Sequence, residues 1–363
     1  MSNRRNVIYA LLILSLLLGL ATSRALMFSV AYVLGGLLIL SFLWGWTGVA
    51  WVRLRRTTRA RRAQVGGIFE ETFTVRNSGI LPKLWLEVRD HSKLPGHRAS
   101  HIVPGMLPRS EHTWVARTRC VVRGEFQLGP VTLSSGDPFG LFKFPRHIGA
   151  TSRIIVYPAT VPIHDFALPT GLLSGGDAQR RRAHFVTTNA AGVRDYEPGD
   201  SFNRIHWRST ARKGRLLVKE FELDPLADVW VFLDLCANTI VQRPDAQQTI
   251  ANAARSRSDG LLLPASTEEY GVVIAASLAK FFLDKRRNLG LVTYGPQREV
   301  LHADRSQRQL NHILEVLALV KGTSDFDLEH MLSIDTEYLG RGTTLIVITA
   351  DQNESWVRQA HIL

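Results

Sequence analysis

Two long apolar runs fill most of the first fifty positions of the chain. Beyond them, apolar residues occur in short segments separated by polar residues. Residues 7–22 are almost uninterrupted apolar sequence, and residues 26–52 form a second run broken only by Gly, Ser, Thr and Tyr. A helix that spans a bilayer needs about 20 apolar residues, with about 17 as the lower limit. The second run exceeds this length, and the first lies near the limit. Because only residues 23–25 separate them, the pattern predicts a hairpin of two membrane-spanning helices.

The distribution of arginines predicts the orientation of this hairpin. Arg4 and Arg5 precede the first run, Arg24 alone occupies the turn, and six arginines follow the second run. The positive-inside rule then places both ends, and the bulk of the chain, in the cytoplasm. A cleaved signal peptide is an alternative for the first run, since basic residues, a short apolar core and small residues are also its signature. The second run would still stop transfer and keep the bulk inside.

The six arginines suggest an anionic partner. The chain carries a formal net charge of +12, which is typical of proteins that bind nucleic acid or lipid headgroups. Clustering just after an apolar run favours headgroups, at roughly 1 kcal/mol per charge. Without a zinc-finger spacing or an aromatic-basic motif, nucleic-acid binding is disfavoured. The predicted headgroup residues are Arg53, Arg55, Arg56, Arg59, Arg61 and Arg62.

From residue 63 to residue 160 the apolar period changes to two, which is typical of half-buried strands. Leu86 and Val88 alternate with Glu87 and Arg89 in one run, and a second run, residues 114–123, alternates in the same way. Turn signals containing Gly, Pro, Asn and Asp separate the runs. The pattern predicts a small antiparallel β-sandwich. Only two cysteines are present, so neither a disulfide framework nor a Cys-x-x-Cys metal site is expected.

A dense string of charged and aromatic residues between residues 186 and 222 leaves three interpretations open. In the first, its acidic and basic side chains pair with one another and hold a rigid turn. In the second, the arginines bind an anion or a partner. In the third, Asp200 and His206 act as an acid–base pair, with Arg204 or Arg208 holding an anionic substrate. Because no nucleophile accompanies them at a recognisable spacing, catalysis is the least supported of the three.

This string resembles the bacterial family called domain of unknown function fifty-eight. The resemblance also covers Arg123-Gly124-Glu125-Phe126 and Asp137-Pro138-Phe139-Gly140-Leu141-Phe142 upstream. It implies a membrane hairpin, a β-rich region, a von Willebrand factor A-like domain, and work with MoxR-type AAA+ ATPases beside other membrane proteins. The residues that carry it are Arg194-Asp195-Tyr196-Glu197-Pro198-Gly199-Asp200, then Arg204-Ile205-His206-Trp207, then Ala211-Arg212-Lys213-Gly214.

Alternating apolar runs and helical periods after residue 226 predict a doubly wound α/β domain. Its parallel strands are expected at residues 229–235, 289–294 and 344–349, and its helices at residues 270–282 and 309–320. Ligands of such sheets bind at the carboxyl ends of the strands. Asp234 and Asp351 both lie at such ends.

The family resemblance implies a magnesium site at this edge, where a von Willebrand A domain has Asp-x-Ser-x-Ser. Here the string is Asp234-Leu235-Cys236-Ala237-Asn238. Mg²⁺ requires hard oxygen ligands, and a thiol is soft, so a degenerate site built from Asp234, Asn238 and Asp351 is expected to bind poorly. A metal-free interaction surface is the favoured interpretation. Since a complete fold would contain another strand after Asp351, we also expect the domain to be incomplete.

The expected organisation is a hairpin with a basic flank (1–62), a β-rich domain (63–160), a linker with the family motif (161–226) and the A-like domain (227–363). No phosphate-binding loop, His-Glu-x-x-His pair or Gly-x-Ser-x-Gly elbow is present. We therefore expect a non-enzymatic, two-pass adaptor of the bacterial inner membrane, with an enzyme acting through Asp200 and His206 as the alternative. The expected partners are membrane lipids and an AAA+ ATPase, with Mg²⁺ as the only cofactor considered.

Overall fold

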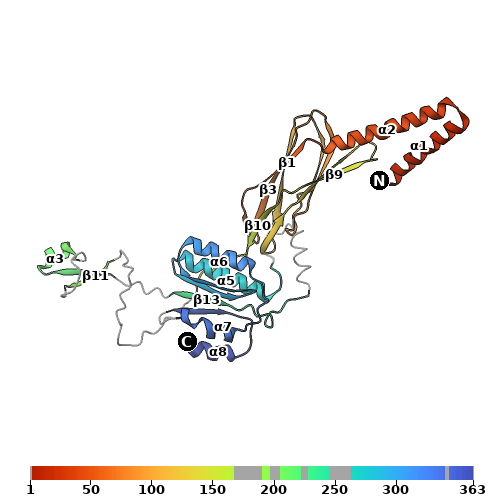
Figure 1. The fold of residues 1–363 in the computed structure, drawn as a ribbon. Helices are drawn as coiled ribbons and strands as arrows, with labels where there is room; N and C mark the ends of the chain where they lie inside the picture. The colour runs from red at the N-terminus through yellow and green to blue at the C-terminus, as the bar shows by residue number, and fades with distance from the viewer. Residues whose placement is uncertain are drawn as a thin grey trace.

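The computed structural model describes residues 2–166, 190–196, 205–221, 228–244, 263–339 and 343–362. Two N-terminal apolar helices, several small antiparallel sheets and a C-terminal mixed α/β region follow one another along the chain. The helix pair projects from one end of the sheets, and the α/β region lies at the other end (Figure 1). The described part is therefore elongated, with the β-region (residues 52–157) in the middle.

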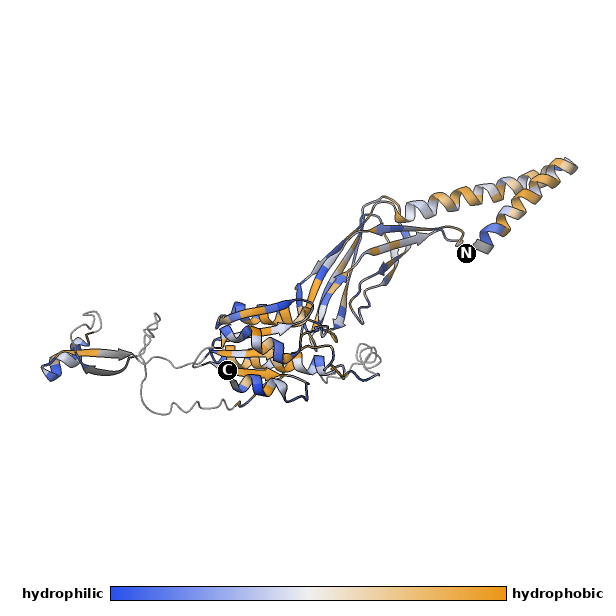
Figure 2. Cartoon of the chain, turned by 60° about the horizontal axis from the view of Figure 1, so that its bottom comes forward, coloured by the Kyte–Doolittle hydropathy of each residue, from blue (hydrophilic) through white to orange (hydrophobic). Residues whose placement is uncertain are grey.

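The first two helices agree with the predicted hairpin. Helix α1 covers Ser2–Thr22 and helix α2 covers Ala25–Val49. Both are long and apolar enough to cross a membrane, by length and composition. Their apolar side chains are mostly exposed, and the pair is coloured as hydrophobic over most of its length (Figure 2). A core helix of a soluble protein would bury such a surface, so these helices lack that packing.

The β-region begins earlier than the sequence predicts. Strand β1 (Val52–Thr58) pairs along its whole length with β3 (Ile68–Asn77), which pairs in turn with β6 (Glu111–Arg119). The arginine-rich segment expected as a hairpin flank up to residue 62 is therefore mostly an edge strand. Charged residues on an exposed edge strand discourage pairing with other chains, which explains their abundance there.

A second sheet packs against the first, and the two share one core. Its strands, in spatial order, are β5 (His101–Met106), β4 (Lys83–Asp90), β8 (Val131–Gly136) and β9 (Lys143–Ile148). Phe73 and Val75 from the first sheet meet Leu86, Val88 and Leu133 from the second, all fully buried. The alternation predicted for residues 86–89 and 114–123 is confirmed for Leu86, Val88, Ala116 and Cys120, whereas Arg123, on the predicted polar face, is buried.

A third sheet lies at the end of the β-region that meets the α/β region. It contains β2 (Arg62–Gln64), β10 (Ser152–Tyr157) and β7 (Gly124–Leu128). Cys120 lies in the core beneath it, together with Val273 from the α/β region. Burial raises the pKa of the Cys120 thiol to about 11, as expected for an unreactive structural cysteine.

The α/β region contains a four-stranded sheet with helices on both faces. Strands β13 (Val229–Leu233), β14 (Leu289–Tyr294) and β16 (Thr344–Ile348) are parallel, as predicted. An antiparallel edge strand that the sequence did not reveal, β15 (Arg298–Asp304), pairs with β14. The sheet is therefore mixed, in the order β15-β14-β13-β16.

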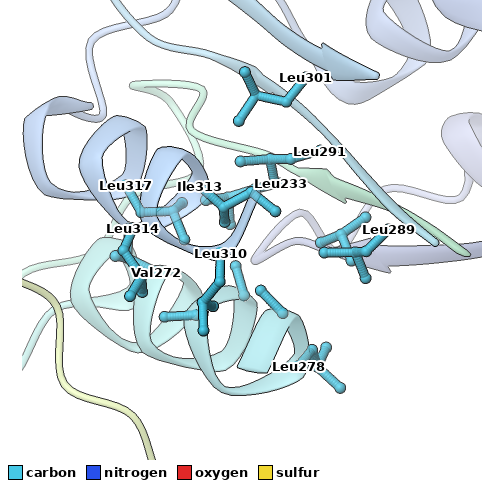
Figure 3. Close-up of a cluster of buried hydrophobic side chains, with 14 of the residues drawn as sticks. Leu233, Val272, Leu278, Leu289, Leu291, Leu301, Leu310, Ile313, Leu314 and Leu317 are labelled. Atoms are coloured by element: carbon cyan, nitrogen blue, oxygen red, sulfur yellow. The ribbon is translucent and has the colours of Figure 1, made fainter. Parts of the chain in front are cut away.

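Helices cover both faces of this sheet. Helices α5 (Thr267–Asp284) and α6 (Gln307–Leu319) confirm the predicted pair, and their apolar side chains form the core shown in Figure 3 together with leucines of β13, β14 and β15. The opposite face is covered by three elements: α7 (Leu328–Ile334), the 3-10 helix η2 (Asp335–Tyr338) and α8 (Ser355–Ile362). Burial on both faces explains why β13 reads as a continuous apolar run.

The described part of the family motif forms a separate small unit. Strand β11 (Ala190–Asp195) pairs with β12 (Leu217–Phe221), and the short helix α3 (Trp207–Lys213) precedes β12. Gly214 ends α3 with a φ of 65°. That left-handed conformation favours glycine.

Candidate functional site

The carboxyl ends of the parallel strands bring together a network of hydrogen bonds around Asp234. This aspartate follows β13 directly and is buried. Its Oδ1 accepts a hydrogen bond from the backbone nitrogen of Cys236, at 2.9 Å. Its Oδ2 accepts one from the hydroxyl of Thr349, at 2.7 Å, and lies 3.5 Å from that of Thr239. Because both oxygens are engaged, the carboxylate is satisfied within the protein.

The other predicted metal ligands are arranged less favourably for magnesium. Asn238 is exposed, and the Asp351 Oδ1 accepts a hydrogen bond from the backbone nitrogen of Asn353, at 2.9 Å. A buried thiol, Cys236, occupies the position at which the A-domain pattern has a hydroxyl. Such a donor set does not fit Mg²⁺, which requires hard oxygen ligands. Within the described ranges, no three His, Cys, Asp or Glu side chains are placed to hold a metal ion. Magnesium at this edge stays a prediction without support from the donor chemistry.

Apolar side chains surround the Asp234 network on the solvent side. Val241 is 67 % exposed and is bonded to Thr267 at the start of α5. Its backbone nitrogen donates to the Thr267 hydroxyl, and its carbonyl accepts from the Thr267 backbone nitrogen. Phe326 is exposed and stacks on His330 at 5.0 Å. Its loop is tied to the Asp234 loop, because the backbone nitrogen of Ala237 donates to the carbonyl of Ser324. We name this surface the strand-end face; it comprises Asp234, Thr239, Val241, Tyr270, Phe326 and Thr349.

Several described residues of the family motif have structural roles that explain why these residue types occur there. The His206 Nδ1 accepts a hydrogen bond from the backbone nitrogen of Ser209 and so caps α3. Asp195 pairs with Arg215 at 3.0 Å, a partner that the sequence pattern did not indicate. Trp207 begins α3 and is 65 % exposed. An exposed tryptophan is suited to contact another protein.

The remaining motif residues divide into two groups. Arg194 and Tyr196 take part in the strand pairing through their backbones, and Arg212 lies exposed in the last turn of α3. Five residues lie outside the described residues: Glu197, Pro198, Gly199, Asp200 and Arg204. The proposed acid–base pair of Asp200 and His206 therefore stays a prediction.

The six arginines predicted to bind headgroups do not form one cluster. Arg53 and Arg55 are exposed on β1, close to the end of α2. Strand rise is about 3.3 Å per residue, so the far end of β1 lies about 20 Å away. Arg59 and Arg61 follow that far end, and Arg62 bonds to Glu315 on α6, at 3.2 Å. This separation divides the six arginines into two groups, and Arg59, Arg61 and Arg62 lie on the side away from α2.

For Arg56 the headgroup prediction is wrong. Its guanidinium is buried, bonds to both carboxylate oxygens of Glu71, and lies 3.3 Å from Asp90. The imidazole of His97 completes the group, with its Nε2 at 3.3 Å from the Glu71 Oε2. Burial alone raises the pKa of Glu71, but hydrogen bonds with His97 and Arg56 outweigh burial and hold that pKa below its ordinary value. The strand register turns this one arginine into the core, where only paired charges are stable.

A further buried arginine, which the sequence did not single out by role, joins the β-region to the α/β region. Arg123 bonds to Glu268 at 2.5 Å and to Glu269 at 3.1 Å, both in the first turn of α5. It also donates to the carbonyls of Leu317, at 2.9 Å, and Val320, at the C-terminal end of α6. A cation is favoured beside carbonyls at a helix C-terminus. The Arg-Gly-Glu-Phe string could have indicated a role, but not the partners.

A family model and a curated relative both match part of this chain. Residues 192–363 match the family model described as "Protein of unknown function DUF58". The uncharacterized protein YeaD of Bacillus subtilis is 24 % identical over 203 residues, which cover 55 % of this chain and 43 % of YeaD. The chain thus spans less than half the length of this curated relative.

Similarity to solved structures is low. The CARDB domain of a Pyrococcus furiosus protein, crystallised with di-metal ions, aligns with 29 % of this chain and 91 % of its own length, at 13 % identity and a TM-score of 0.22. A PapD-like domain of human CEP192 aligns with 30 % of this chain and 85 % of its own length, at 8 % identity and a TM-score of 0.20.

Proposed function

Residues 192–363 of this chain belong to the DUF58 family of proteins of unknown function, and from that premise we propose that the protein is a non-enzymatic, membrane-anchored adaptor. Helices α1 and α2 hold it in the bacterial inner membrane, with the bulk in the cytoplasm. The α/β region, a doubly wound domain of the von Willebrand A type, presents its strand-end face to a partner. The family resemblance points to a MoxR-type AAA+ ATPase, acting in the assembly or maturation of other proteins.

The observation that carries this proposal is the chemistry of the strand-end face. Asp234 is the only buried acid among the described residues of this face, and both of its carboxylate oxygens accept hydrogen bonds from within the protein. Such an aspartate organises the loops and is poorly placed to attack or deprotonate a substrate. Around it, Val241 and Phe326 leave apolar surface exposed. Rigid loops that carry exposed apolar side chains favour a protein-docking surface.

The distribution of arginines supports the orientation. Arg4 and Arg5 at the start of α1 and Arg53 and Arg55 after α2 lie at the same end of the hairpin, and Arg24 alone lies at the other. The positive-inside rule assigns the richer end to the cytoplasm. The β-region and the α/β region follow that end.

Recovery of partners from detergent-solubilised membranes tests the adaptor role. We expect the full chain to recover an AAA+ ATPase, and Val241→Asp to lower that recovery at least about tenfold, since a charge would be desolvated in the interface. The matched control is Val115→Asp, because Val115 is 49 % exposed on β6, in the β-region. Recovery of no ATPase, with or without ATP, contradicts the proposed partner. If Val241→Asp and Val115→Asp recover the same amount of ATPase, the strand-end face is not the docking surface.

A further inference from the structure

Helix α2 continues into the β-region with almost no linker. Only Ala50 and Trp51 separate α2 from β1. A Cβ placed on Gly45 would lie 2.9 Å from the ring of Phe144, and one on Gly48 would lie 2.7 Å from the hydroxyl of Ser135. The two glycines therefore let the last turns of α2 pack directly on β8 and β9. The β-region cannot swing away from the helix pair.

The turn between β8 and β9 extends along the helices. Asp137 shapes this turn by accepting hydrogen bonds from the backbone nitrogens of Phe139, at 2.9 Å, and Phe142, at 2.6 Å. The ring of Phe142 packs edge-on against Phe42 of α2, with centroids 5.6 Å apart, and lies 5.7 Å from the guanidinium of Arg5. The hairpin of β9 accordingly reaches towards the first residues of α1 (Figure 1).

These contacts limit how much of α2 is free to lie in a bilayer. From Phe42 onwards one face of α2 packs on the β-region, which leaves residues 25–41 free of such contact. At 1.5 Å per residue this segment measures about 25 Å. The hydrocarbon core of a typical bilayer is about 30 Å thick. The free segment has about the minimum length that spans this core, so the residues from Phe42 onwards, and the end of the β-region packed on them, are expected at the headgroup layer.

That end carries large apolar side chains on three loop tips. They are Ile80, which is 76 % exposed, Leu107 and Phe139, both also exposed. One tip is bonded to the helix–strand junction, because the backbone nitrogen of Ser78 donates to the carbonyl of Trp51. The second tip is bonded to the first, because the Asn77 amide donates to the carbonyl of Leu107. The third tip is the β8–β9 turn itself. All three tips therefore lie at the end of the β-region that meets α2.

We propose that Ile80, Leu107 and Phe139 insert into the interfacial layer of the bilayer, so that the β-region contacts phospholipid directly. This inference rests on the proposed membrane anchor and adds a second contact to it. Trp46 and Trp51 are exposed beside the same junction, and indole rings prefer the headgroup level. Exposed basic side chains flank the tips, with Arg109 two residues after Leu107 and Arg53 on β1. They are placed to pair with lipid phosphates.

Lipid-dependent quenching of a fluorophore tests the inference in the full chain. Single cysteines at Ile80, Leu107 and Phe139 are labelled in vesicles of phosphatidylethanolamine and phosphatidylglycerol that contain lipid spin-labelled high on the acyl chain. Ile68→Cys is the matched control, because Ile68 is 67 % exposed at the other end of β3. Leu14→Cys in α1 reports the anchor. The native Cys120 and Cys236 are buried, and the unsubstituted chain gives the labelling background.

We expect quenching at the three tips to be several-fold stronger than at Ile68 and comparable to that at Leu14. Quenching at Leu14 but not at the tips overturns the inference and leaves the anchor standing. Tips shielded from both spin-labelled lipid and aqueous iodide are covered by protein, which also overturns it. Absence of quenching at Leu14 overturns the membrane anchor itself, and the inference with it. Thermal unfolding of each labelled variant shows whether the fold is retained.

Discussion

The β-region is joined to its neighbours at both ends, and the two junctions rely on different physical interactions. At the helix end, Gly45 and Gly48 allow close contact between apolar surfaces. At the other end, the buried cation of Arg123 is shared by Glu268, Glu269 and two carbonyls of α6. Apolar packing loses stability in small steps as contacts are removed. A buried ionic junction fails when one partner is removed, because the others remain desolvated without a counter-charge.

The largest expected effect follows from Arg123→Ala. Its loss leaves two mostly buried carboxylates and two carbonyls unpaired, so we expect a decrease of about 3 kcal/mol in the free energy of unfolding. Urea unfolding of the detergent-solubilised chain measures it. The control is Arg153→Ala, since Arg153 is 78 % exposed in its ion pair with Glu125. That variant should lose less than about 1 kcal/mol. Equal losses would mean that the Arg123 junction is no stronger than a surface pair.

The helix junction is tested by Gly48→Leu. A leucine side chain would overlap Ser135, so we expect overpacking to cost about 1–3 kcal/mol in the same urea measurement. Gly36→Leu is the matched control, because nothing lies within 4 Å of a Cβ at Gly36. Leucine has the higher helix propensity, so that control should be neutral or slightly stabilising. A neutral Gly48→Leu would show that α2 does not pack tightly on β8.

The smallest effect is a difference in pH dependence between two buried glutamates. The pKa of Glu71 is lowered, so its contribution to stability is complete above its ordinary value of 4.5 and is lost as the pH falls towards the lowered pKa. Burial raises the pKa of Glu269, although Arg123 opposes this. Its contribution has the opposite sign: it is present below pH 4.5 and lost as the pH rises through the raised pKa.

Glu71→Gln and Glu269→Gln separate these two effects. Urea midpoints measured from pH 3.5 to pH 7 should show a weaker acid destabilisation for Glu71→Gln than for the unchanged chain. For Glu269→Gln the acid destabilisation should become steeper, since the opposing contribution is removed. If the urea midpoint depends on pH in the same way in all three chains, neither carboxyl has a different pKa in the folded and unfolded states.

Local pattern predicted much of the fold. The helix pair, β4, β6 and the three parallel strands follow from apolar periods that a short window contains. Strand β15 escaped prediction because only Val300 and Leu301 are adjacent apolar residues in an otherwise polar edge strand. The β-region began early because arginines on an edge strand resemble a basic membrane flank.

The candidate site was predicted in position but not in chemistry. Asp234 and Asp351 were expected at strand ends, since parallel strands share one edge. The hydroxyl that engages Asp234 comes from Thr349, which lies 115 positions away, and no local pattern encodes such a pairing. The same applies to Arg56 and Arg123, whose partners are set by register and by domain contact. Sequence distance hides these interactions because side-chain pairing depends on the assembled fold.

The ten-residue strand β3 extends between the two junctions of the β-region. At about 3.3 Å per residue it measures about 33 Å, and among the described residues both junctions are direct contacts, through close packing at one end and through the Arg123 ion pairs at the other. The β-region is thus a strut of fixed height between the helix pair and the α/β region. A partner that bound the α/β region and pulled on it would therefore transmit force through the β-region to the membrane helices.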